Sequence, residues 1–260
     1  MATLVSFHAH PDDECILCGG VLRKAADEGH RVVLVVATRG EVGEVADDFL
    51  DEGELLRDRR VRETHASAEV LGAKRVEFLG YVDSGMMGEA TNQAENTFWT
   101  APVEEAAARL AAILVDENAD VLTVYDDNGG YGHPDHIQVH RVGLRAAELA
   151  GTPRVYQATM NRDHMNRGRA AAAGDGQNPA PDVDTSGFGK PEAELTTAVD
   201  VRAYLDVKRA AMRAHASQIS EQSFFLAQPD EVFAGFFGTE WFIRVGAEPG
   251  VTENDLFTGL

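Results

Sequence analysis

The sequence has few cysteines, few basic residues and no long apolar run, and each shortage narrows the class of protein. No apolar run approaches the roughly 18 residues that a membrane-spanning helix needs. The first residues, MATLVSFHAHPDDE, lack the basic start, the apolar core and the cleavage site of a secretory signal. We therefore expect a cytoplasmic protein with no membrane partner.

The scarcity of basic side chains argues against nucleic acid as a partner. Lysine and arginine together number 23 against 43 aspartates and glutamates, which gives a formal net charge of −20. Nucleic acid and anionic membrane surfaces would both repel a chain of this charge. The remaining composition, with 44% apolar and 25% charged residues, is typical of an ordinary globular protein.

The two cysteines, Cys15 and Cys18, stand in C-x-x-C spacing. A thioredoxin-like redox pair has this spacing. A structural zinc site would need two further thiol or imidazole ligands nearby. We favour the simpler interpretation, in which both cysteines are small apolar residues in the first turns of a helix.

Apolar periodicity predicts strands and helices that alternate along the first part of the chain. Continuous β-branched runs such as RVVLVVAT are typical of strands buried on both faces. Alternation of this kind predicts an α/β, three-layer Rossmann-like fold, with a mostly parallel sheet and helices on both faces. The expected strands are 3–7, 31–38, 75–80, 120–125 and 154–159, and the expected helices are 16–30, 54–73, 102–119 and 133–151.

The pattern is weaker beyond residue 160. The segment 168–194 is rich in glycine, alanine, proline and aspartate, so we expect a long loop or excursion at about 160–195. A helix at about 200–216 and a late strand at 240–245 follow. The sequence shows no internal repeat and no clear linker, and we predict a single domain over 1–260.

Two segments crowded with ligand-type side chains follow the first and fourth predicted strands. HAHPDDE comes directly after the first strand and DDNGGYGHPDH after the fourth. Open α/β sheets bind their ligands at the carboxyl ends of the strands, where both segments would lie. His10 and Asp13 are three positions apart, as are His133 and His136.

This spacing favours a shared metal site. A catalytic zinc ion takes three protein ligands and leaves one position for water. One metal held between the two segments would explain why both carry an HPD core. The alternative is that the prolines and aspartates simply begin helices, with proline in the first position and acids in the first turn. Two such motifs, each at a strand end, favour the metal.

The motifs AHPDDE and GGYGHPDH, in this order, resemble those of the zinc-dependent LmbE/PIG-L de-N-acetylases. The shorter segments TRGEVGE, DSGM and KRAAMRAHASQ also fit, and within the family the chain is most similar to the actinobacterial mycothiol-pathway branch. The resemblance implies a hydrolase that removes the acetyl group from an N-acetylglucosamine-type sugar. It implies Zn²⁺ as cofactor, and the sequence does not decide whether Fe²⁺ replaces it in the cell.

The resemblance also divides the roles within the first motif. It implies that His10, Asp13 and His136 bind the metal, whereas Asp12 is the general base. The side chains of two adjacent residues diverge, so one aspartate can hold the metal while the other faces the water and accepts its proton. We therefore expect Asp12 and Asp13 to differ in function despite their identical chemistry.

In the second motif, the resemblance makes His133 the group that stabilises the oxyanion or protonates the leaving amine. Asp135 would orient His133 or raise its pKa, as a nearby carboxylate does. Tyr131 resembles the family tyrosine that reaches the acetyl carbonyl, and a packing aromatic is the alternative. His140, one turn beyond His136, would close the water position as a fourth ligand, so we expect a supporting or plain helical role.

Three residues are expected to contact the substrate. Arg60 lies where the family places a substrate-binding arginine, although the neighbouring arginines at 57, 59 and 62 leave that choice open. Asp83, in DSGM, is a candidate acceptor for sugar hydroxyls, with a plain turn residue as the alternative. Glu14 could cap the helix or touch the site. We expect His8 to support the site from the core, and His215 belongs to a late motif without an evident role.

Four further functions compete with deacetylation of an amino sugar. The same metal core would serve an amidase of a mycothiol-like S-conjugate or act on another small N-acyl compound. A nucleotide-binding enzyme would need G-x-G-x-x-G after the first strand, where HAHPDDE stands. A non-catalytic sugar-binding protein would not need the complete set of ligand-type residues. We expect a small-molecule N-acyl amino sugar as partner, and the sequence leaves a homo-oligomer open.

Overall fold

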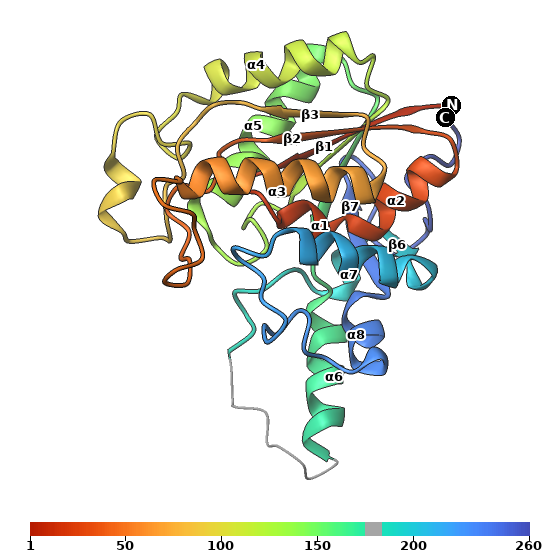
Figure 1. Cartoon of the computed structure of the whole chain (residues 1–260). Coiled ribbons are helices and arrows are strands. Elements are labelled where there is room, and N and C mark those ends of the chain that lie inside the picture. The colour runs from red at the N-terminus through yellow and green to blue at the C-terminus, as the bar shows by residue number, and fades with distance from the viewer. Residues whose placement is uncertain (175–183) are drawn as a thin grey trace.

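The computed structural model describes residues 1–174 and 184–260, which form one seven-stranded sheet with helices on both faces (Figure 1). The strand order is β3-β2-β1-β4-β5-β7-β6, and the first five strands along the chain are parallel. β7 runs antiparallel to both of its neighbours. The strands are β1 (Thr3–His8), β2 (Arg31–Val36), β3 (Arg75–Phe78), β4 (Val121–Tyr125), β5 (Arg154–Thr159), β6 (Thr197–Asp200) and β7 (Thr239–Arg244).

The helices divide between the two faces. α4 and α5 pack against each other on one face, while α2, α3 and α7 cover the other (Figure 1). This arrangement confirms the predicted α/β fold with a mostly parallel sheet. Among the described residues, no helix is both long and apolar enough to cross a membrane. The helices are α1 (Asp13–Leu17), α2 (Gly19–Asp27), α3 (Leu56–Leu71), α4 (Val103–Asp116), α5 (Pro134–Ala150), α6 (Arg162–Gly174), α7 (Leu205–Ala214) and α8 (Asp230–Phe237), with 3₁₀ turns at Ala90–Gln93, Glu192–Glu194 and Arg202–Tyr204.

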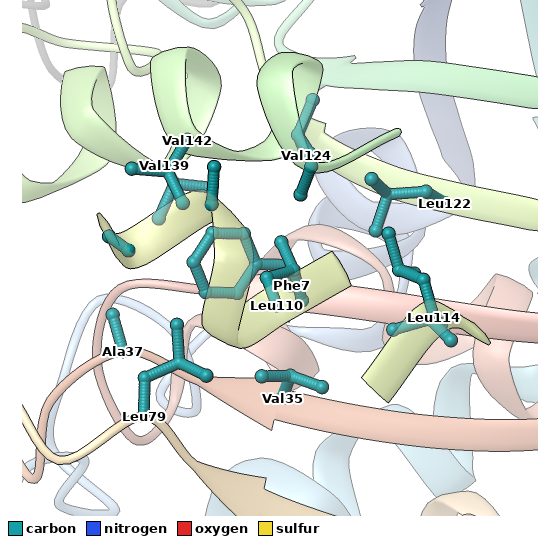
Figure 2. Close-up of a cluster of buried hydrophobic side chains, with 14 of the residues drawn as sticks. Phe7, Val35, Ala37, Leu79, Leu110, Leu114, Leu122, Val124, Val139 and Val142 are labelled. Atoms are coloured by element: carbon teal, nitrogen blue, oxygen red, sulfur yellow. The ribbon is translucent and has the colours of Figure 1, made fainter. Parts of the chain in front are cut away.

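The central strands carry apolar side chains on both of their faces, because helices cover both faces of the sheet. Alternate residues of β1 point to opposite sides of the sheet. Phe7 lies in the cluster formed with Leu110 of α4 and Val142 of α5 (Figure 2). Leu4 lies in the second cluster, on the side of α2, α3 and α7. The continuous runs of the sequence follow from this double burial.

The structure differs from the sequence predictions in three places. The helix predicted over 16–30 is two helices, α1 and α2, which meet at Cys18. The first part of the loop expected at about 160–195 is the helix α6, whose run of alanines has high helix propensity. Residues 175–183 of that segment lie outside the described residues. The strand β6 and the helix α8 were not predicted.

Both cysteines are free and buried against the core, as the simpler interpretation expected. Burial raises the pKa of the Cys15 and Cys18 thiols above the ordinary value. Redox-active cysteines have a lowered pKa instead, because the thiolate is the reactive form. Both thiols pack in the apolar cluster, and that of Cys15 also donates to the carbonyl oxygen of Asp12 at 2.9 Å.

The strand order brings the segments HAHPDDE, after β1, and DDNGGYGHPDH, after β4, together at the carboxyl ends of the strands. The chain builds outward from β1 to β2 and β3 on one side, and from β4 to β5 on the other. The loops that follow β1 and β4 therefore turn away from each other and leave a crevice, where α/β folds bind their ligands. HAHPDDE and DDNGGYGHPDH both lie at this crevice.

A close approach of α5 to β4 fixes the helix that carries the second motif. A Cβ atom added at Gly143 would overlap the side chain of Val124. We expect Gly143→Ala to destabilise the fold by about 1–3 kcal/mol, the usual range for overpacking a core. Gly235→Ala is the matched control, since that glycine is helical and exposed and an added Cβ atom would meet nothing within 4 Å. It should be neutral or slightly stabilising through helix propensity. Urea unfolding of both variants measures the difference, and equal effects would contradict this packing argument.

Candidate metal centre

The first loop is shaped by an unusual backbone at Asp12. Its φ of 100° lies in the left-handed region, which a residue with a side chain seldom adopts. Two contacts hold it there: Asp12 N donates to Glu14 Oε2 at 3.0 Å, and Cys15 N donates to Asp12 O at 3.1 Å. α1 begins at the next residue. The turn therefore places the side chains of Asp12 and Asp13 in different directions.

The second loop is shaped by the beginning of α5. His133 is the N-cap, Pro134 follows in the first turn, and His136 therefore lies in the first turn of the helix. His136 Nδ1 lies 3.1 Å from the carbonyl oxygen of Gly129, to which it donates. Gly129 has a φ of 61°, and a Cβ atom there would overlap His136. Glycine at this position lets the loop approach the ring and leaves His136 Nε2 with its lone pair free.

Three ligand atoms from the two loops converge. His10 Nδ1 lies 3.4 Å from Asp13 Oδ2 and 3.3 Å from His136 Nε2, and the last two atoms are 3.4 Å apart. In a tetrahedral site with bonds of about 2.0–2.1 Å, neighbouring ligand atoms are about 3.3–3.4 Å apart. The triangle thus fits one face of a tetrahedral metal site, and two imidazoles with one carboxylate are an ordinary donor set for such an ion.

His10 is oriented from its other side by a carboxylate. Its Nε2 lies 3.1 Å from Asp135 Oδ2 and 3.4 Å from Asp83 Oδ1, so this nitrogen donates and Nδ1 keeps its lone pair. Metal-binding histidines are commonly held by a carboxylate in this manner. Asp135 touches His133 only through its backbone, where Asp135 N donates to His133 Nδ1 at 3.1 Å. The Asp135 carboxylate therefore contacts His10 directly, while its charge also opposes the lowering of the pKa of His133, which is the effect that the sequence analysis expected.

The charges of the site favour a cation. Burial alone would raise the pKa of Asp13, but the neighbouring His136 and His10 hold it well below its usual range. Burial alone would lower the pKa of His10, yet the carboxylates of Asp83, Asp13 and Asp135 raise it well above its usual value. Several buried carboxylates around the histidine rings attract positive charge. The site is fit to hold a divalent metal ion.

Asp12 stands beside this triangle with a different partner. Burial raises the pKa of its carboxyl group to about 6, and the charge of Arg60 opposes this rise. Arg60 Nη2 lies 3.3 Å from Asp12 Oδ2 and 2.6 Å from the carbonyl oxygen of Pro11, and Nη1 donates to Gly40 O at 2.9 Å. Arg60 is buried and belongs to the site, whereas Arg59 and Arg62 pair with Glu54 at the surface.

His133 and Tyr131 complete the site. Because His133 Nδ1 accepts from the backbone, the neutral ring carries its proton on Nε2. Burial, helped by the charges of His10 and His136, lowers the pKa of His133 to about 4, so the neutral form prevails at pH 7. Tyr131 is 41% exposed, and its ring centroid lies 5.0 Å from that of His136. The tyrosine therefore stands at the rim of the site.

These side chains line one cavity of about 630 Å³ at the sheet edge. It holds eight of the ten residues that the sequence analysis selected, and the other two, Asp135 and Glu14, lie fully buried behind it. The eight are His10, Asp12, Asp13, Arg60, Asp83, Tyr131, His133 and His136. Val42, Glu44, Met86, Glu89, Met160, Phe188 and Phe225 are among the further lining residues.

The sequence pattern of a known family covers both loops. The PIG-L family, described as GlcNAc-PI de-N-acetylase, matches residues 5–147, which hold all three ligands of the triangle. The chain belongs to the PIG-L family. The predicted family is thereby confirmed on more than half of the sequence.

Full-length relatives support this assignment. This PIG-L member is 42% identical to the 1D-myo-inositol 2-acetamido-2-deoxy-alpha-D-glucopyranoside deacetylase of Acidothermus cellulolyticus, over 99% of this chain and 95% of the relative. It is 40% identical to the enzyme of the same name from Streptomyces griseus, over 99% and 88% of the two chains. These relatives confirm the predicted class, an N-deacetylase.

Solved structures show which other proteins share this fold. The N,N'-diacetylchitobiose deacetylase of Pyrococcus horikoshii has a TM-score of 0.58 and 25% identity, over 94% of this chain and 83% of that one. A 4-carboxy-2-hydroxymuconate hydratase from Pseudomonas putida has the same TM-score at 20% identity, over 98% and 99%. The second likeness concerns the fold alone, because one fold supports several chemistries.

Glu14 supports the PIG-L site from behind and does not face the cavity. Its side chain is fully buried, with Oε1 accepting from Ser67 Oγ at 2.5 Å and from His215 Nε2 at 2.6 Å. Its Oε2 accepts from Asp12 N. The predicted substrate contact is therefore replaced by a supporting role. The motif that contains His215 gave the signal for this partner, but the sequence did not connect it with Glu14.

Two other histidines lie away from the ligand triangle. His8 Nε2 contacts Ser6 Oγ at 2.7 Å, and His8 Nδ1 contacts the hydroxyl of Tyr125 at 2.9 Å. His140 Nδ1 lies 3.0 Å from the carbonyl oxygen of Tyr125. Neither lines the cavity, in keeping with the supporting roles expected. Ser84, whose N–H donates to Asp135 Oδ2 at 2.9 Å, was missed although the segment DSGM contains it.

Removal of the Glu14 carboxylate should leave the buried His215 ring without the carboxylate that it contacts directly. We expect Glu14→Ala to lower stability by about 3–5 kcal/mol, the range for breaking a buried ion pair. Glu14→Gln keeps an oxygen that can accept from Asp12 N and should lose less. Denaturant unfolding at pH 6 compares the two variants. Equal losses would show that the packing of this side chain matters and its hydrogen bonds do not.

Proposed function

We propose that this chain is a zinc-dependent hydrolase that removes the N-acetyl group from an N-acetylglucosaminyl-inositol. The observation that carries the proposal is the convergence of His10, Asp13 and His136 on one point, with Asp12 beside it, at the edge of an open cavity. The substrate follows from the names of the full-length relatives. Those names favour an acetylated sugar over the thiol-conjugate amidase that the motifs left open.

His10, Asp13 and His136 would hold the metal. Three protein ligands with an open fourth position are typical of catalytic zinc, and Fe²⁺ is the alternative ion for the same donors. When bound, the ion would supply Lewis acidity towards a water molecule and the acyl carbonyl group. The carboxylate of Asp135 keeps His10 in the tautomer that this task needs.

We assign Asp12 as the general base, which accepts a proton during hydrolysis. Its carboxylate lines the cavity, and a pKa of about 6 leaves it ionised at pH 7 yet close enough to neutrality to exchange a proton. It takes a proton from the attacking water and returns it to the leaving nitrogen, so that the products are an amine and acetate. Arg60 holds the accepting oxygen in place.

His133 is the hydrogen-bond donor in this scheme. Its neutral ring lines the cavity with Nε2–H as the free donor, which suits the oxygen that becomes negative during attack on the amide. This favours the oxyanion role over proton donation to the amine. Tyr131 follows glycines of positive φ at 129 and 130 and precedes one at 132, so the loop can bring its hydroxyl to the substrate.

Sugar hydroxyls would bind on the side of Asp83. Its carboxylate lines the cavity, and nearby positive charge holds its pKa below its usual range, so it accepts hydrogen bonds at pH 7. The guanidinium of Arg60 already has three partners within the protein. We therefore propose that Arg60 chiefly positions Asp12, and that any substrate contact of Arg60 is secondary.

Substitution of the two adjacent aspartates should affect the metal content of the protein differently. Asp13→Ala removes a ligand and should lose most of the bound metal. Asp12→Ala should keep the metal while turnover falls by at least ~10²-fold, the scale of losing a general base. Mass spectrometry of the metal per chain, together with deacetylation rates, measures both. Loss of metal in the Asp12 variant would reverse the assignment of the two residues.

Activity on an N-acetylglucosaminyl-inositol tests the proposed function directly. Deacetylation should stop after chelation and return on addition of Zn²⁺, with Fe²⁺ tested in parallel under anaerobic conditions. Measurement of released acetate gives the rate. Turnover that survives complete removal of metal would rule out the proposal.

A further inference from the structure

Four polar side chains lie buried together on the two central strands, beside the ligand triangle. Ser6 and His8 belong to β1, and Thr123 and Tyr125 belong to β4. Each of them is at most 1% exposed, and none of the four lines the metal cavity. The chemistry proposed above gives them no task, although a buried polar group is costly unless it has hydrogen-bond partners.

The pairing of the two strands brings these side chains into one row. Ser6 and Thr123 are partners in the register of β1 with β4. His8 and Tyr125 follow them by two residues, and side chains two residues apart in a strand share a face. Ser6 Oγ lies 2.6 Å from Thr123 Oγ1 and 2.7 Å from His8 Nε2. His8 Nδ1 lies 2.9 Å from the hydroxyl of Tyr125. We call the four side chains the polar row.

The polar row ends at the metal ligands. The ring of Tyr125 packs beside that of His136, with the two centroids 4.6 Å apart. Its hydroxyl forms a hydrogen bond with the carboxylate of Asp13. Burial and the charge of Asp13 raise the pKa of Tyr125 well above its usual value, so the hydroxyl keeps its proton. Tyr125 thus contacts two of the three residues of the ligand triangle.

The carboxylate at the end of the row decides where the proton of Tyr125 points. An ionised carboxylate only accepts hydrogen bonds, so the hydroxyl donates its single proton to Asp13. The hydroxyl oxygen then accepts from its two other neighbours, Ala9 N at 3.2 Å and His8 Nδ1 at 2.9 Å. His8 therefore carries a proton on Nδ1.

The remaining protons of the row follow from this assignment. Burial lowers the pKa of His8 to about 4, so the ring is neutral at pH 7 and Nε2 has only a lone pair. Nε2 accepts from Ser6 Oγ, which in turn accepts from Thr123 Oγ1. In the opposite arrangement Tyr125 would donate to His8 and turn a lone pair towards the carboxylate, where the two oxygens repel each other. Every proton of the row therefore points towards Asp13.

We infer that His8 is a positioning residue of the metal site: its Nδ1–H fixes the rotation of the Tyr125 hydroxyl, which then holds the carboxylate of Asp13 towards the metal. The inference rests on the ligand triangle of the proposed function. Without the imidazole the hydroxyl can turn about its C–O bond, and Asp13 loses a fixed donor. Loss of such a partner behind a metal ligand typically weakens metal binding by about 10- to 100-fold.

The tautomer of His8 is open to direct measurement. Long-range ¹H–¹⁵N NMR spectra of the ¹⁵N-labelled protein with Zn²⁺ distinguish a protonated ring nitrogen from an unprotonated one. We expect the proton of His8 on Nδ1. A proton on Nε2 instead would reverse the direction of the polar row and overturn the inference.

Two substitutions test the two nitrogens of His8 separately. The amide nitrogen of asparagine stands near the position of Nδ1, whereas that of glutamine reaches the position of Nε2. His8→Asn therefore keeps a donor for Tyr125, and His8→Gln loses it. Competition with a chromophoric chelator measures the dissociation constant for Zn²⁺. We expect His8→Gln to weaken binding by about 10- to 100-fold and His8→Asn to keep most of the affinity. Equal dissociation constants in the two variants would overturn the inference.

Tyr125→Phe removes the hydroxyl and should weaken Zn²⁺ binding as much as His8→Gln does. The double variant should bind Zn²⁺ no more weakly than either single variant, because both substitutions act through one hydrogen bond. Tyr156→Phe is the matched control, since Tyr156 is a buried tyrosine of the neighbouring strand β5 whose hydroxyl contacts Glu253 at 3.3 Å. It should leave the dissociation constant unchanged. Additive losses in the double variant would overturn the inference.

Urea unfolding of the metal-free variants separates positioning from a loss of stability. Each variant leaves a buried polar group without its partner and should be less stable. Lower stability with an unchanged dissociation constant for Zn²⁺ would make the polar row purely structural and overturn the inference. If His8→Gln does not fold, Ser6→Ala takes its place, since it removes only the hydroxyl that donates to Nε2. It should weaken Zn²⁺ binding by a smaller factor, and unchanged binding would again contradict the role of His8.

The same measurements separate this inference from the proposed function. If the native protein binds Zn²⁺ but hydrolyses no acetylated amino sugar, while His8→Gln weakens Zn²⁺ binding, the proposed function fails and the role of His8 stands. If the native protein hydrolyses the sugar and His8→Gln leaves the dissociation constant unchanged, the proposed function stands and the role of His8 fails.

Discussion

The site depends on the imidazole of His10, because its two nitrogens serve two different tasks. Nδ1 faces Asp13 and His136, whereas Nε2 faces the carboxylate of Asp135. His10 and His136 are 126 positions apart in the sequence, and the pairing of β1 with β4 brings their loops together. Without a carboxylate on Nε2 the proton of the ring could occupy Nδ1, and the ligand triangle would lose a lone pair. The geometry of both loops is therefore arranged around one ring and its tautomer.

The types of residue in the site could be predicted from the sequence, but their directions could not. Strand periodicity located HAHPDDE and DDNGGYGHPDH at the sheet edge, and the spacing within each segment indicated a shared metal site. The resemblance to the family then implied His10, Asp13 and His136 as the ligands. Nothing in the spacing shows that Asp135 turns its carboxylate to His10 and only its N–H to His133. The difference arises at the beginning of α5, where His133 is the N-cap and its ring accepts from Asp135 N. Local patterns do not record such tertiary choices.

Glu14 and α6 illustrate two other reasons for the limits of sequence prediction. Glu14 could have faced the cavity, since it follows Asp13 directly, but the left-handed turn at Asp12 sends it into the core towards Ser67 and His215. A buried acid of this kind needs partners from other elements, and they come from α3 and from the end of α7. In α6, the alanine run is both a low-complexity signal and a strong helix former, and only the second property decided the outcome.

The arrangement of the loops along the sheet edge separates chemistry from specificity. The metal ligands come from the loops after the central strands β1 and β4, whose positions are fixed by burial on both faces. The end of the cavity that holds Asp83 belongs to the loops after β2 and β3. Changes in these loops would leave His10, Asp13 and His136 in place, because the three ligands come from other loops. Such separation is consistent with a fold shared by deacetylases and a hydratase, in which the sheet supplies the frame and the loops supply the reaction.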